Sequence, residues 1–308
     1  MNPKLGIALK LGAVVAFIAM QSLIKSTGGR VPAGEIVFFR SFFAFPVILA
    51  WLAWTHELHV GWRTANPMSH VWRGVVGTSS MGLGFAGLML LPLPEVTALS
   101  YAAPILTVIF AAMFLGEEVR VVRIFAVALG MTGVVIVLAP QLTAFSEGHL
   151  GATRALGAVL VLLSATFAAL AQIFLRKMVA HERAATVVFY FTVSSTLFSL
   201  FTIPFGWVLP SGRDALVLIL AGLAGGVGQG LLTSSYRFAH ASLVAPFDYA
   251  SMLLAIAIGY VVFAEVPTGQ TLAGATLVVA AGILIIWRET RLGLDRDKPR
   301  GAGAAPQG

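Results

Sequence analysis

Apolar runs of about 20 residues dominate this 308-residue chain and restrict it to folds that a lipid bilayer can surround. Only 11% of the residues are charged, whereas about 25% is usual in a soluble domain. The sequence therefore predicts an all-α membrane protein with ten transmembrane helices. Their approximate limits are 5–24, 35–54, 71–91, 95–115, 121–139, 155–175, 185–206, 214–234, 242–263 and 270–287.

An internal repeat divides the predicted helices into two groups of five. Residues 74–119 resemble residues 222–267, which lie 148 positions further on, and nine of the 46 aligned positions are identical. The identical pairs include Tyr101 with Tyr249 and Glu117 with Glu265. Because five is an odd number, the second group crosses the bilayer in the opposite direction, as in many secondary transporters.

The repeat also predicts the domain organisation. The expected units are a first five-helix repeat, a linker, a second inverted five-helix repeat and a disordered cytoplasmic tail, at 1–140, 141–154, 155–287 and 288–308.

The distribution of lysine and arginine predicts the orientation. With the N-terminus in the cytoplasm, fifteen of the 20 basic residues fall on the inner side, four fall on the outer side, and Arg40 lies within a span. We therefore expect a multi-pass protein of the cell inner (plasma) membrane with both termini in the cytoplasm. The first run is long enough to span the membrane and no small-residue cleavage site follows it, so a cleavable signal is not expected.

Composition excludes several functional classes. The basic residues are scattered along loops rather than clustered on one face, which argues against nucleic-acid binding. The chain has no cysteine, hence no disulfide or thiolate metal site, and we expect neither a metal nor a cofactor. A membrane-embedded enzyme would need several ionisable groups at one depth, and a passive channel would not need an inverted repeat. We expect a transporter whose partners are the bilayer and a small-molecule solute, present as a monomer or a homodimer.

Arg40 is one candidate site residue. It lies about five residues inside the second predicted span, roughly 8 Å below the outer surface. A charge at that depth is costly unless it is paired or faces water. It can line an outward cavity and bind an anion, with Glu95 as a partner at the outer end of the fourth span. Alternatively, its side chain reaches the lipid headgroups and only anchors the helix.

Asp248 is the only acidic residue well inside a predicted span. An unpaired carboxylate there can carry a proton and couple transport to it. The alternative is a local salt bridge with Arg237, at the end of the preceding span.

The other candidates are polar or helix-breaking residues at mid-span positions. Tyr101 and Tyr249 can stack on a planar solute or can simply belong to helix packing. Gln21, Gln172 and Gln229 each need a polar partner and are candidate cavity residues. Pro104 and Pro246 are candidate hinges or simple kinks, and Glu95 is a candidate gating residue.

Two segments resemble the repeats of EamA-type members of the drug/metabolite transporter superfamily. The first is Leu91-Pro-Leu-Pro-Glu95 with Tyr101, Pro104 and Phe114-Leu-Gly116-Glu117. The second is His240-Ala-Ser-Leu-Val-Ala-Pro246-Phe-Asp248-Tyr249 with Phe263-Ala-Glu265, Gly274 and Ala281-Gly282. The second segment departs from the pattern at Met252 and Ala264, where proline and glycine are common. The Phe39-Arg40 pair is also typical of the superfamily.

The resemblance implies both an architecture and an activity. It implies ten helices in two inverted repeats, with a central cavity lined by helices 1, 3, 4, 6, 8 and 9. It implies alternating-access movement of a small organic metabolite, by exchange or linked to protons. The motifs are most similar to those of members that take up vitamins or metabolites such as riboflavin and S-adenosylmethionine. Amino-acid or metabolite export on the same scaffold remains the alternative.

Overall fold

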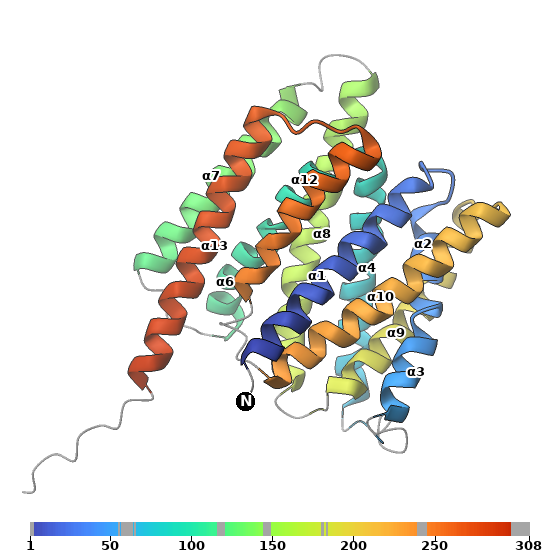
Figure 1. Cartoon of the computed structure of the whole chain (residues 1–308), viewed down its shortest axis with the longest axis horizontal. Helices are drawn as coiled ribbons and strands as arrows, with labels where there is room; N and C mark the ends of the chain where they lie inside the picture. Colours follow the sequence, from blue (N-terminus) through green and yellow to red (C-terminus); the bar gives the residue numbers. More distant parts are fainter. Residues whose placement is uncertain are drawn as a thin grey trace, which may run out of the picture.

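The computed structural model describes residues 3–54, 56, 64, 66–115, 121–143, 149–179, 182, 184–238 and 245–296. Within these ranges the regular structure is helical (Figure 1). The α-helices are α1 (Pro3–Ser26), α2 (Ala33–Phe42), α3 (Phe45–Trp54), α4 (Pro67–Leu90), α5 (Leu93–Ser100), α6 (Ala102–Leu115), α7 (Val121–Thr143), α8 (His149–Val179), α9 (Ala184–Leu200), α10 (Gly212–Phe238), α12 (Ala250–Phe263) and α13 (Gly269–Arg296). Two short 3₁₀ segments, η2 (Ile203–Phe205) and η3 (Ala245–Tyr249), complete them.

The predicted fold class is confirmed. By length and composition, four helical segments among the described residues can cross a membrane, namely Lys4–Ser26, Ala33–Trp54, Gly151–Leu175 and Gly212–Leu232. Shorter apolar helices occupy Ile124–Pro140, Thr186–Leu200, Phe247–Phe263 and Gly269–Leu284. Three predicted spans are divided in the structure, into α2 with α3, α5 with α6, and η3 with α12.

Prolines account for two of these divisions. Pro46 lies four residues after Phe42, where α2 ends, and Pro104 lies four residues after Ser100, where α5 ends. A proline has no N–H to donate to the carbonyl four residues earlier, and its ring clashes with that carbonyl. Each helix therefore stops at the residue whose carbonyl loses its partner.

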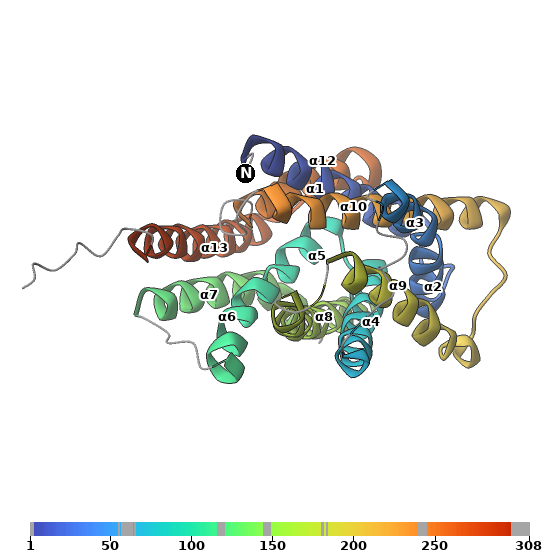
Figure 2. The same cartoon turned by 90° about the horizontal axis from the view of Figure 1, so that it is seen from below.

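The helices of the two groups pair symmetrically. The most extensive contacts join α1 with α10, α4 with α8, and α7 with α13, and α2 also packs on α9 and α5 on α12. Counted by predicted spans, the first span of each group contacts the third span of the other, as in α1 with α10 and α8 with α4. The second, fourth and fifth spans contact their counterparts in the other group. Two copies of one unit related by a two-fold axis make contacts of this reciprocal kind. Figure 2 shows α7 with α13 at one end of the molecule and α2 with α9 at the other.

Glycines permit the closest of these contacts. A Cβ atom added at Gly133 of α7 would lie 2.6 Å from the carbonyl oxygen of Gly274 on α13, and a Cβ added at Gly274 would lie 2.6 Å from the Gly133 oxygen. Small residues allow backbones to approach in membranes, where apolar surface alone gives helices little reason to associate. The main buried cluster then joins both groups through residues such as Ile24, Leu99 and Leu218.

Candidate functional site

The two repeat-related tyrosines meet near the centre of the bundle. Tyr101 follows the last residue of α5, and Tyr249 is the last residue of η3, so both lie where a helix is interrupted. Their ring centroids are 5.1 Å apart in an edge-to-face arrangement, and the Tyr101 hydroxyl is 2.6 Å from Ser251 Oγ. Equivalent residues that contact each other lie beside the two-fold axis that relates them.

Asp248 forms an ion pair with a residue that the sequence analysis did not consider. Lys10 Nζ on α1 lies 2.7 Å from Asp248 Oδ1, and Lys10 is only 2% exposed, whereas the Asp248 side chain is 53% exposed. The alternative partner, Arg237, has a side chain outside the described part of the structure. Lys10 had been counted with the basic residues of the cytoplasmic side. Its position five residues inside the span predicted for 5–24 is the signal that could have identified it as an intramembrane charge.

A second ion pair joins α1 to α12 at the opposite end of α1, which we call the far side of the molecule. Lys25 Nζ lies 2.9 Å from Glu265 Oε1 and donates to the Leu91 carbonyl at 2.5 Å. The other Glu265 carboxylate oxygen accepts the backbone N–H of Leu93 at 2.8 Å. These contacts hold the end of α1, the start of α5 and the end of α12 together.

Glu95 belongs to the same far-side region. It is 7% exposed in the first turn of α5, where the helix dipole favours a carboxylate. Its electrostatic neighbours include Arg154, Glu265 and Lys25. Arg40 is not among these neighbours, so the structure gives no support to the Arg40–Glu95 pair suggested by the sequence.

Arg40 is buried rather than extended toward the headgroups. It is 5% exposed on α2, and its Nε atom has no hydrogen-bond partner among the described residues. Nε faces Gly225 of α10, where an added Cβ would lie 3.2 Å from it and 2.8 Å from Met20 Sδ. The anchoring alternative does not fit a guanidinium enclosed by α1, α2 and α10.

The remaining candidates are dispersed. Gln21 and Gln229 are half-buried on the closely packed helices α1 and α10, and Gln172 is exposed on α8. Pro104 is exposed in the first turn of α6. Pro246 lies in η3, and its side chain is outside the described set.

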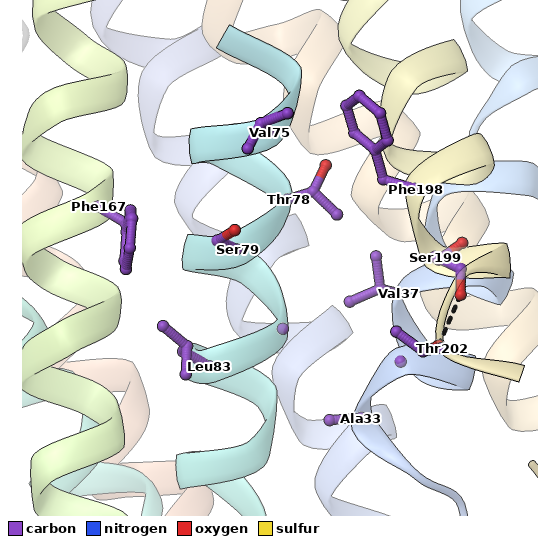
Figure 3. Close-up of a pocket in the computed structure, with 12 residues that line it drawn as sticks. Ala33, Val37, Val75, Thr78, Ser79, Leu83, Phe167, Phe198, Ser199 and Thr202 are labelled. Atoms are coloured by element: carbon purple, nitrogen blue, oxygen red, sulfur yellow. Dashed lines mark hydrogen bonds between the residues drawn. The ribbon is translucent and has the colours of Figure 1, made fainter. Parts of the chain in front are cut away.

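A cavity of about 620 Å³ opens between α2, α4, α8 and α9 (Figure 3). Its walls are largely apolar, with hydroxyl groups from α4 and from the end of α9; the lining residues are Ala33, Gly34, Val37, Val75, Thr78, Ser79, Gly82, Leu83, Phe167, Phe198, Ser199 and Thr202. The resemblance implied a cavity lined by spans 1, 3, 4, 6, 8 and 9. Of the helices around the observed cavity, only α4 and α8, the third and sixth spans, belong to that set. None of the candidate site residues lines this cavity, so it differs from the predicted central one.

The repeat and its inverted packing match a known transporter architecture. The sequence profile of the EamA-like transporter family matches residues 4–139 and again residues 155–287. The chain belongs to the EamA-like transporter family. The profile of solute carrier family 35 also matches residues 94–204 of this EamA-like protein.

Several relatives are similar over nearly their whole length. An S-adenosylmethionine uptake transporter of Rickettsia felis is 28% identical over 93% of this chain and 94% of its own. The pseudopaline exporter CntI of Pseudomonas aeruginosa is 31% identical over 92% of this chain and 96% of its own. A riboflavin transporter of Vibrio cholerae is 28% identical over 94% of this chain and 95% of its own.

A solved crystal structure has the same fold. It superposes with a TM-score of 0.64 at 19% sequence identity, over 95% of this chain and 99% of its own. The protein is thus a multi-pass membrane transporter of a small-molecule solute and not an enzyme, as the sequence predicted.

Proposed function

We propose that this EamA-like transporter is a secondary carrier that moves a small organic metabolite across the inner membrane by alternating access. The reciprocal pairing of helices between the two groups is the observation that supports it most. Two inverted units in contact can form two equivalent arrangements, one open to each side. Movement of one unit against the other then exposes a site at their interface alternately.

The two ion pairs between α1 and the ninth span act as gates in this proposal. Lys25–Glu265 closes the far side, with Glu95 beside it, and Lys10–Asp248 closes the side where α1 begins. Opening either side requires separation of α1 from the ninth span at that end. Protonation of Asp248 would remove the negative charge of the second pair, which makes Asp248 the proposed coupling residue.

We propose that Tyr101 and Tyr249, which contact each other beside the two-fold axis, form the solute site. Each tyrosine ring lies where a helix is interrupted, and such rings can contact a planar ring of a solute by stacking or edge to face. We propose uptake of a ring-containing vitamin or metabolite such as riboflavin or S-adenosylmethionine, in accordance with two of the relatives. Export is the alternative, since a relative with similar coverage is named as an exporter.

Counterflow into proteoliposomes tests the carrier mechanism. Vesicles loaded with unlabelled riboflavin or S-adenosylmethionine are expected to accumulate the labelled compound saturably and faster than unloaded vesicles. Flux that neither saturates nor responds to internal solute would identify a channel. Rates in right-side-out and inside-out membrane vesicles distinguish uptake from export.

A matched pair of variants tests the tyrosine site. Tyr249→Ala is expected to raise the KM of the transported compound about tenfold, because one aromatic contact contributes about 0.5–1.5 kcal/mol beyond its buried area. Tyr260→Ala on α12 removes the same side chain from a position that is 63% exposed, and its KM should stay at the wild-type value. Equal KM values for both variants would exclude the tyrosine pair from the site.

A further inference from the structure

Unpartnered buried polar atoms concentrate at one place in the bundle. Six such side-chain atoms are found in the described residues, and four of them belong to Arg40, Ser41 and Arg73. Buried polar groups in folded proteins are nearly always hydrogen-bonded, so a cluster without partners needs a specific reason. These three residues lie on α2 and α4.

Arg73 was counted among the cytoplasmic-side residues, but the structure places it two turns into α4. Its guanidinium stacks on the ring of Phe191, with Cζ 4.2 Å from the ring centroid. Its Nη1 lies over Gly77, where a larger residue would occupy the same space. Nε and Nη1 are nevertheless buried without a hydrogen-bond acceptor. The side chain is thus held in place by an aromatic ring and a glycine, while Nε and Nη1 have no hydrogen-bond acceptor.

The helices α2 and α4 contact each other, and Arg40 is an electrostatic neighbour of the Arg73 guanidinium. Neither arginine belongs to the ion pairs described above or to the contact of His70 with Glu182. The nearby buried carboxylate of Glu35 accepts the backbone N–H of Val208 at 3.1 Å. Two like charges in a membrane bundle, one on the buried Arg40 and one on the half-buried Arg73, repel each other and are costly. An anion between them would remove the repulsion and use the free donors.

The cavity described above is lined by residues of α2 and α4 that lie near the two arginines in the sequence. Val37, one turn before Arg40 on α2, lines it, and so does Thr78, which follows the glycine that Arg73 covers. Guanidinium groups bind carboxylates through paired N–H donors, a geometry that lysine cannot reproduce. The chemistry of the cluster therefore matches a carboxylate on a solute of moderate size.

We propose that Arg40 and Arg73 together form the subsite for a carboxylate group of the transported metabolite. This inference rests on the proposed carrier function and narrows its solute to carboxylate-bearing compounds. S-adenosylmethionine has such a group and riboflavin has none, so the arginine pair favours the former. The vitamin suggested by the sequence is disfavoured for the same reason.

Competition against counterflow of labelled S-adenosylmethionine tests the subsite. Decarboxylated S-adenosylmethionine should compete about 10- to 100-fold more weakly than S-adenosylmethionine, the effect of a charged hydrogen-bonded contact. In Arg40→Met and in Arg73→Met this preference should shrink to nearly equal competition. Arg30→Gln is the matched control, because Arg30 is 54% exposed and pairs with Asp214, and it should keep the preference.

Thermal unfolding separates binding from a structural role. Removing a buried, unpartnered charge should raise the Tm of Arg40→Met by roughly 2 to 4 °C, whereas loss of a structural residue would lower it. A lower Tm, or an unchanged preference for the carboxylate in both variants, would overturn the subsite. Saturable transport of riboflavin but not of S-adenosylmethionine would also overturn it and would leave the carrier mechanism intact. The absence of saturable transport for both compounds would instead count against the proposed carrier, and the Tm of Arg40→Met would still decide the subsite.

Discussion

Lys10 is a buried cation that pairs with an acidic residue from the second half of the chain. It is 2% exposed, and its ammonium group contacts the carboxylate of Asp248. A buried ion pair contributes little net stability, but removing one partner leaves the other charge without compensation. When one member of a buried ion pair is replaced, the loss of folding stability therefore depends mainly on how well the remaining charge is solvated.

Asp248→Asn should destabilise the protein by about 1–3 kcal/mol. This is below the range usual for a fully buried pair, because the Asp248 side chain is 53% exposed. Thermal unfolding in detergent measures the effect. Lys10→Met combined with Asp248→Asn should recover much of the loss, since no charge then remains buried at the site. Asp214→Asn is the matched control and should have a smaller effect, because its partner Arg30 is 54% exposed and can be solvated.

The same variant tests the proposed coupling role. Asparagine cannot ionise, so Asp248→Asn resembles the protonated state at every pH. Its transport rate should therefore lose the pH dependence of the wild-type rate, measured in the same proteoliposomes across the same pH range. A pH profile that keeps the wild-type shape would assign Asp248 to stability alone.

At the scale of helices, prolines and glycines decide where elements stop and how closely they approach. Pro46 and Pro104 each end a helix at the residue four positions earlier and so divide the spans predicted at 35–54 and 95–115. The reciprocal contact of Gly133 with Gly274 cannot be anticipated from the sequence, because it requires knowledge of which two helices cross. The sequence shows that glycine is abundant, whereas the packing shows that Gly133 is a position where a larger residue would clash with the neighbouring helix.

Gly133→Ala should therefore destabilise the α7–α13 contact. The new methyl group would lie 2.6 Å from a backbone oxygen, which cannot rotate away, and overpacking of this kind costs about 1–3 kcal/mol. Gly230→Ala on α10 is the control, because nothing lies within 4 Å of its added Cβ. Alanine is the better helix former, so this control should be neutral or more stable by about 1 kcal/mol. Equal Tm values for the two variants would show that α7 and α13 can separate without cost.

At the scale of the whole molecule, α1 is tied to the ninth span at two heights by Lys10–Asp248 and Lys25–Glu265. The far-side pair is further supported by the Leu91 carbonyl and the Leu93 N–H. The bundle thus has an ion pair near each end of α1, and these are the two contacts that we propose as gates. Which of them opens first depends on the relative stability of the two contacts.

Glu265→Gln should open the far side more often. Loss of the carboxylate weakens both the contact with Lys25 and the bond from Leu93. The natural chain has no cysteine, so a single cysteine at Leu93, which is fully buried, can report the change. Its labelling by a membrane-impermeant maleimide from the far side should accelerate severalfold in the Glu265→Gln background.

Leu209→Cys provides the control for this measurement, because Leu209 is 99% exposed in either state. It should label at the same rate in both backgrounds. If Leu93→Cys also labels at one rate in both, the Lys25–Glu265 contact does not govern access from that side.

Orientation remains a prediction from charge alone, and a fusion experiment decides it. Green fluorescent protein at the C-terminus should fluoresce, since it folds in the cytoplasm, and alkaline phosphatase at the same position should be inactive. The opposite pair of results would place the C-terminus outside and would reverse the assignment of the far side.

The sequence by itself determined the membrane class, the approximate limits of the apolar spans, their inverted duplication and the membership of a transporter family. These properties depend on hydropathy, on proline positions and on short motifs, all of which are local along the chain. Even the Tyr101–Tyr249 relation was visible from the repeat, although their contact was not.

Only the tertiary structure decided how the charges are combined. Lys10 with Asp248, Lys25 with Glu265 and Arg40 near Arg73 each join residues from different helices. Such combinations depend on which helices are neighbours and on how each helix is rotated about its axis. The sequence around each residue indicates neither of these properties. The gates and the proposed anion subsite follow from that packing.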